Sequence, residues 1–164
     1  MVEILVVIGI IVILVGIILA AVLQARASAD SLHCLNNIRQ VTTGLRMYAG
    51  DWNNRFPNPA LLNVSWESTL QQYLPDRQVF RCPLDLEVAP ATGSSYDWRD
   101  TGNPETTLAG KSINAVPRNL VLAMEALPGW HKPRKVNVGR IDGSVESIGD
   151  QELVVDLMTP VHGP

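Results

Sequence analysis

An uninterrupted apolar segment near the N-terminus constrains this chain more than any other feature. From Ile4 to Leu23 the sequence contains only Ile, Val, Leu, Ala and Gly. A helix of that length, rising about 1.5 Å per residue, spans about 30 Å, which is the hydrocarbon thickness of a bilayer. The segment therefore predicts a transmembrane helix.

A cleaved secretory signal peptide is the alternative explanation of such a segment. Signal peptides have a basic region before the apolar core, a shorter core and a cleavage motif of small residues. No Lys or Arg stands before the segment in this sequence, and residues that suit a helix follow it without a break, namely Gln24, Ala25, Arg26 and Ala27. We therefore expect the segment to be retained.

Beyond the segment the apolar pattern changes from continuous to one-sided. Apolar residues recur three or four positions apart, at Leu32, Leu35, Ile38, Val41, Leu45 and Tyr48. This spacing is typical of an amphipathic helix that packs one face on a core. We predict a single helix that continues from the membrane and ends near Gly50, before the turn-forming pair Asn53 and Asn54.

The rest of the chain has the composition of one small domain. The 164 residues are 46% hydrophobic, but many of the apolar residues lie in the N-terminal segment. What remains is enough for one core. We predict a transmembrane and assembly helix over residues 1–25 and one globular domain over 26–164. The net charge is −3 and the sequence has no basic run, so we do not expect a nucleic-acid partner.

The two cysteines, Cys34 and Cys82, show no metal-binding pattern in the sequence. They form no CxxC motif and have no Cys/His ligand spacing, so a structural zinc site is not expected. In an oxidising compartment they can pair with each other. The alternative is two separate buried thiols.

The middle of the chain predicts a short helix and a loop. Ser65 suits the cap of a helix over residues 66–74, which Pro75 stops. Residues 90–110 are rich in Gly, Ser, Thr, Asp and Pro and show no periodicity. We expect an irregular surface loop there.

The C-terminal third predicts strands and a last helix. Residues 119–124 are a strand candidate, and residues 135–141 and 144–148 form the clearest hairpin. Asp142 and Gly143 between them suit a two-residue turn that requires positive φ. Asp150 is expected to cap a last helix that ends at Met158. The expected fold class is α+β.

The N-terminal residues also carry a family resemblance. The run Glu3-Ile-Leu-Val-Val-Ile-Gly-Ile-Ile-Val-Ile-Leu14 resembles the prepilin motif of type IV pilins and type II secretion pseudopilins, in which one glutamate heads an apolar helix. Further matches, in order, resemble the pseudopilin-like proteins of planctomycetes: Cys34-Leu-Asn-Asn-Ile-Arg-Gln, Met47-Tyr48-Ala49, Phe80-Arg81-Cys82-Pro83, and His131 followed by Asp142-Gly143. The resemblance implies a pilin-like fold, with the long helix packed on a small antiparallel sheet.

The resemblance also implies a function and a location. Proteins of this kind are structural subunits, not enzymes, that polymerise into a type IV pilus-like or pseudopilus filament through the N-terminal helix. A prepilin peptidase cuts and methylates them, and an inner-membrane platform assembles them from a single-pass state with a periplasmic domain. The alternative is a membrane-anchored periplasmic binding domain that does not polymerise. Two features depart from the family: no leader with glycine and phenylalanine precedes Glu3, and Ala20 replaces a common proline.

The resemblance gives Glu3 a role in assembly. In the family the matching carboxylate is thought to meet the N-terminal amine of a neighbouring subunit, which fixes the axial offset between helices. The simpler alternative is a carboxylate that reaches the membrane interface near a helix N-terminus. Gly9, Gly16 and Ala20 supply small residues that let another helix approach closely.

The resemblance makes further predictions for the globular domain. It favours a disulfide between Cys34 and Cys82. Glu125, His131, Asp142 and Gly143 match its acid, histidine and Asp-Gly positions, and we expect them to pin a loop to the hairpin by hydrogen bonds. No cofactor is expected.

Two other chemical readings of the domain are less favoured. Calcium held by Asp85, Asp97 or Asp100 is an open alternative, although the sequence has no EF-hand spacing. Cys34, His131 and Asp142 include the residue types of a nucleophile, a base and an orienting acid, but nothing beyond residue type supports catalysis.

Overall fold

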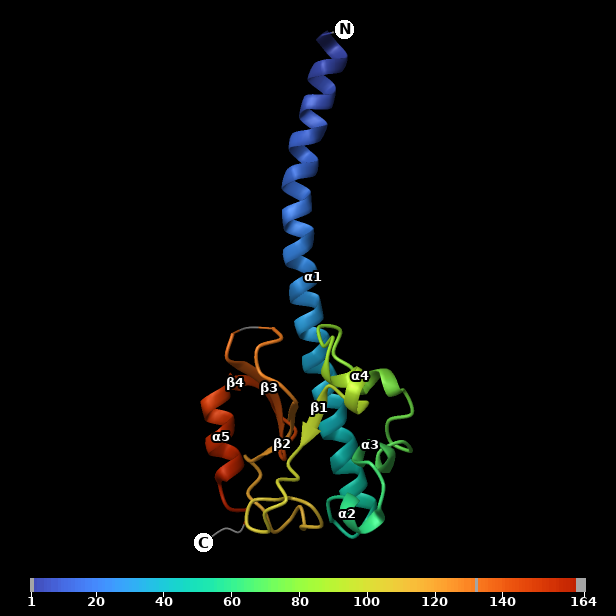
Figure 1. Ribbon diagram of the computed structural model, residues 1–164, viewed down its shortest axis with the longest axis vertical. Coiled ribbons are helices and arrows are strands. Elements are labelled where there is room, and N and C mark those ends of the chain that lie inside the picture. Colours follow the sequence, from blue (N-terminus) through green and yellow to red (C-terminus); the bar gives the residue numbers. More distant parts are fainter. Residues whose placement is uncertain (1, 132, 162–164) are drawn as a thin grey trace.

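A single long helix dominates the computed structural model, which describes residues 2–131 and 133–161. Helix α1 covers Val2–Asp51, as predicted, and its N-terminal half extends away from the rest of the protein (Figure 1). Its buried residues begin at Cys34 and continue to Ala49. Leu32, which we expected on the packed face, is 66% exposed, because the helix meets the domain only after it. Residue 1 of the expected anchor and residues 162–164 of the expected domain lie outside the described residues.

The globular part is built on one antiparallel sheet. Its strands are β1 (Tyr96–Trp98), β2 (Val121–Glu125), β3 (Lys135–Arg140) and β4 (Val145–Gly149), and they lie in the order β1-β2-β3-β4. Strand β1 was not predicted, since it lies within residues 90–110, where we expected an irregular loop. This strand has three residues, and only Tyr96 and Trp98 in it are buried, so it is too short to produce a period-two signal.

The sheet separates two helices and two hydrophobic clusters. On one face the C-terminal half of α1 packs on β2 and β3. Its residues Ile38, Val41 and Leu45 belong to the larger hydrophobic cluster. On the other face lies α5 (Asp150–Met158), whose Leu153 and Leu157 pack on Val136 and its neighbours (Figure 1). The prediction of an α+β fold with a pilin-like shape is confirmed.

Four short helical segments connect α1 to the sheet. They are α2 (Pro59–Leu62), α3 (Trp66–Thr69), the 3-10 helix η1 (Arg77–Phe80) and α4 (Val88–Thr92). The predicted cap of α3 is confirmed, since Ser65 Oγ accepts a hydrogen bond from the Ser68 amide, but α3 ends at Thr69 and does not continue to residue 74. The cap of α5 was misplaced by one residue: Gly149 is the N-cap, and Asp150 is the first helical residue.

The hairpin between β3 and β4 has a three-residue loop, which corrects the predicted two-residue turn. The Arg140 amide donates to the Ser144 carbonyl, and the Gly143 amide donates to the Arg140 carbonyl. Gly143 has a φ of 95°, whereas Asp142 is not among the positive-φ residues. The loop includes Ile141 because this side chain is buried and its amide bonds Leu120. A type I turn followed by a left-handed glycine is the expected geometry for three residues.

Replacing Gly143 by valine is expected to destabilise the domain by more than about 1 kcal/mol, because a β-branched residue resists positive φ. A Cβ atom there would also meet the Arg46 guanidinium, although that flexible side chain can move. The measurement is the free energy of unfolding of the detergent-solubilised chain. A valine variant with unchanged stability would contradict the assigned loop geometry.

Gly139 on β3 lets α1 approach the sheet closely. A Cβ atom built on it would overlap Thr42 Oγ1, and would lie 3.1 Å from Ile38 Cγ2. Its φ is not positive, so the requirement is space and not backbone freedom. Among the described residues, Thr42 Oγ1 is a buried oxygen without a hydrogen-bond partner, which agrees with a very tight contact.

Candidate functional site

The first candidate site is the free half of α1. An apolar window of this helix is long enough to cross a membrane, and none of it is buried within the protein. Glu3 lies in the first turn. Nothing lies within 4 Å of a Cβ built on Gly9 or Gly16, and Ala20 is exposed on the same stretch. All four residues expected to act in assembly are therefore accessible to another chain.

The second candidate site is centred on a disulfide that joins α1 to the segment after η1. The Sγ atoms of Cys34 and Cys82 are 2.11 Å apart, so the predicted pairing is confirmed. The bond closes a loop with a sequence separation of 48 residues. A cross-link of this span stabilises a fold by about 4 kcal/mol in the chain-entropy model.

A buried carboxylate and an imidazole lie beside the disulfide. His131 Nε2 is 2.8 Å from Glu125 Oε1 and 3.6 Å from Cys82 Sγ. Both oxygens of Glu125 accept bonds from Asn137, one from its amide and one from its side-chain nitrogen, each at 2.9 Å. The expected pairing of Glu125 with His131 is therefore present. It joins the β2–β3 loop to β2.

Asp142 does not join this group, which corrects the expectation of a four-residue pin. It lies at the other end of β3, where its Oδ1 accepts bonds from the Ser144 amide and hydroxyl. These bonds lower the pKa of Asp142. Asp142 and Gly143 instead close the hairpin loop. Cys34, His131 and Asp142 consequently do not form a catalytic arrangement, since the Cys34 sulfur is bonded and Asp142 lies elsewhere.

Asp85 is linked to the disulfide segment through hydrogen bonds. Its oxygens accept bonds from the Ser95 hydroxyl and from three amides at the start of α4, those of Glu87, Val88 and Ala89. Ser95 Oγ in turn accepts from the Cys82 amide at 2.9 Å. Burial alone would raise the pKa of Asp85, but these hydrogen bonds outweigh it and lower the pKa. The sequence missed this role.

The proposed calcium ligands do not come together as a site in the part of the chain that the structure describes. Both oxygens of Asp85 are used by protein donors. Asp97 accepts from the Trp98 amide, and Asp100 accepts from the Thr107 hydroxyl. The group of possible ligands found among the described residues is a different one, formed by Cys34, Cys82, Glu125 and His131.

Replacing Asp85 by asparagine is expected to lower stability by about 2 kcal/mol at neutral pH, the scale of hydrogen bonds to a charged group. The folded pKa of Asp85 is depressed. Its contribution is therefore present above the unfolded pKa of about 3.9 and is lost as the pH falls through the folded value. The free energy of unfolding, measured at pH 7 and at about pH 3, should show a gap between wild type and variant that narrows in acid.

Asp76→Asn is the matched control for this experiment. Asp76 is exposed and accepts one bond, from the Gln78 amide at the start of η1. Asparagine caps a helix about as well as aspartate, so this variant should stay close to wild type at both pH values. If the difference in the free energy of unfolding between wild type and Asp85→Asn is the same at both pH values, the assigned role of the carboxylate is contradicted.

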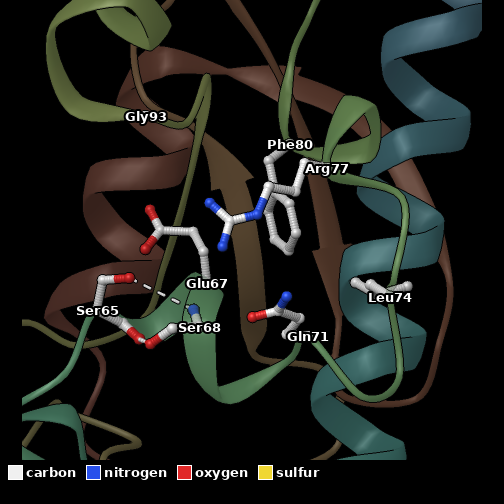
Figure 2. Close-up of a pocket in the computed structure, with 8 residues that line it drawn as sticks. All are labelled: Ser65, Glu67, Ser68, Gln71, Leu74, Arg77, Phe80 and Gly93. Carbon is white, nitrogen blue, oxygen red and sulfur yellow. Dashed lines mark hydrogen bonds between the residues drawn. The ribbon is translucent and has the colours of Figure 1, made fainter.

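A small polar pocket lies between α3, η1 and the end of α4 (Figure 2). Figure 2 shows the Arg77 side chain beside Phe80, with its guanidinium directed toward the Glu67 side chain, whose carboxylate points to the other side. The hydroxyls of Ser65 and Ser68 bond within their own turn of α3. The lining supplies no close pair of nucleophile and base, and we assign the pocket no role.

No protein-family model matches this chain, and neither a curated protein nor a solved structure matches it. The features that indicate a function are therefore the fold, the free half of α1 and the residues that these bring together.

Proposed function

We propose that this chain is a structural subunit of a type IV pilus-like or type II secretion pseudopilus filament. It is anchored in the inner membrane by α1, with the globular domain in the periplasm, and polymerises through that helix. The observation that carries the proposal is that the apolar N-terminal part of α1, residues 2–23, is fully exposed and has a single carboxylate, Glu3, at its head. The prepilin motif and the pilin-like shape support it.

The placement of residues on the helix favours assembly with several neighbours. At 3.6 residues per turn, Gly9, Gly16 and Ala20 lie on one side, and Glu3 points about 120° away from them. A neighbour that packs closely on the small residues is therefore not the neighbour that meets the carboxylate. Two different contacts on one helix suit a helical filament, in which each subunit repeats the same heterologous contacts.

The rigid connection between anchor and domain also fits a filament subunit. Helix α1 continues without a break into the core, and the disulfide ties it to the segment after η1. Because no linker separates the two parts, packing of the helices would fix the positions of the domains as well.

The experiment is to shear cells that express the chain from its own locus, sediment the released material, and quantify the chain in sheared and membrane fractions by immunoblot. The proposal expects a sedimenting fraction that contains this chain. A chain that stays entirely in the membrane as a monomer, with an accessible domain, would support an anchored binding domain instead.

A further inference from the structure

Four potential metal ligands from four separate parts of the chain converge beside α1. Cys34 lies in α1, Cys82 follows η1, Glu125 ends β2, and His131 lies in the loop after it. One ligand atom of each lies within 4.8 Å of all the others. Cys34, Glu125 and Cys82 are 0%, 2% and 3% exposed, and the side chain of His131 is 5% exposed.

We propose that these four side chains bind one zinc ion when Cys34 and Cys82 are reduced. Two thiolates, an imidazole and a carboxylate are ligands that zinc accepts in a four-coordinate site, and thiolates select it over calcium and magnesium. The donors around a tetrahedral zinc are about 3.3–3.8 Å apart, given bonds of about 2.0–2.3 Å. His131 Nε2 and Cys82 Sγ are already 3.6 Å apart. The main change is separation of the two sulfurs.

The surroundings of the group suit a metal site. Asn137 holds both oxygens of Glu125, which is how outer contacts orient a ligating carboxylate. Among the described residues, His131 Nδ1 is buried without a hydrogen-bond partner. The ring proton can therefore move to Nδ1 without breaking a bond there, which leaves Nε2 free for the metal.

The redox state of Cys34 and Cys82 determines whether the group forms a disulfide or a zinc site. A dithiol reductant gives two electrons and two protons to the Cys34–Cys82 bond and leaves as a disulfide, and zinc then displaces the two thiol protons. Without a cation, two thiolates and the Glu125 carboxylate would place three negative charges in a buried space, which is costly. A divalent ion neutralises two of these three charges. The proposed site does not depend on filament assembly.

The test uses the full chain in detergent, reduced with a phosphine and titrated with Co²⁺ as a spectroscopic probe for zinc. The expected result is one Co²⁺ per reduced chain, with thiolate-to-cobalt charge-transfer absorption, and none for the oxidised chain. Loss of an outer contact weakens metal binding 10–100-fold, so Glu125→Gln and His131→Gln, which remove ligands, should each weaken it at least about 100-fold. His33→Gln is the matched control, since His33 is exposed and precedes Cys34. It should bind like wild type.

If the reduced chain unfolds, its circular dichroism spectrum is measured with and without zinc. Added zinc should then restore the folded spectrum, because metal binding supplies folding free energy. The proposal is overturned if the reduced chain gives no charge-transfer absorption and is not refolded by zinc. It is equally overturned if Glu125→Gln and His131→Gln bind Co²⁺ as tightly as wild type.

Discussion

The Glu3→Ala variant is expected to keep normal amounts of membrane monomer but to lose filaments. An apolar methyl in place of a carboxylate lowers the cost of placing the helix in lipid, so insertion should not suffer. If Glu3 neutralises the amine of a neighbouring subunit, however, its removal leaves a buried charge without a partner. Such a loss costs about 3–5 kcal/mol per contact, which shifts the ratio of filament to monomer by at least about 100-fold. Shearing and immunoblotting measure that ratio.

Two further variants separate charge from side-chain size at this position. Glu3→Gln keeps the size but removes the charge, and it should behave like the alanine variant. Ile4→Ala changes the next exposed residue of the same helix and leaves the carboxylate in place. It should assemble nearly as well as wild type. Wild-type filament levels from both Glu3 variants would contradict the role of the carboxylate in assembly.

Gly139→Ala is expected to have the second largest effect, on the stability of the fold. The new methyl would overlap Thr42 Oγ1, so α1 and β3 must separate at the centre of the larger core. Overpacking of this kind costs about 1–3 kcal/mol, and we expect the upper end because two backbone elements must move. The free energy of unfolding in denaturant measures the effect. Gly50→Ala, at an exposed helical position with open space around it, is the control and should cause no loss of stability.

A second substitution tests whether the clash itself is the cause. Thr42→Ala removes the oxygen that the new methyl would meet, and that oxygen has no hydrogen bond to lose among the described residues. The double variant Thr42→Ala/Gly139→Ala should therefore recover most of the lost stability. Strict additivity of the two substitutions would contradict direct contact between these positions.

The elements with long periodic patterns could be predicted from the sequence. The apolar segment and the stripe after it gave α1 and its end at Asp51, and the alternation around Asp142 and Gly143 gave the β3–β4 hairpin. Strand β1 could not be predicted, because three residues carry no period. The loop length was wrong because local turn chemistry favoured two residues, whereas burial of Ile141 draws a third into the loop.

The candidate metal site shows a different limit of sequence reasoning. Zinc motifs are recognised by close spacing, and the spacing of these four residues shows no such motif, since they come from four separate parts of the chain. Only the packing of β2 against α1 brings Glu125 near Cys34. The same packing leaves Asp142 at the far end of β3, although the sequence pattern grouped it with His131.

We expect the exposed half of α1 to pack against other copies of itself. Electron cryo-microscopy of fibres sheared from expressing cells can establish whether it does. We predict fibres whose density fits this chain, with the helices of residues 2–23 in the core, the globular domains outside, and Glu3 next to a neighbouring N-terminus. Fibres with this helix on the outside, or cells that contain the chain but yield no fibres of it, would contradict the proposed assembly.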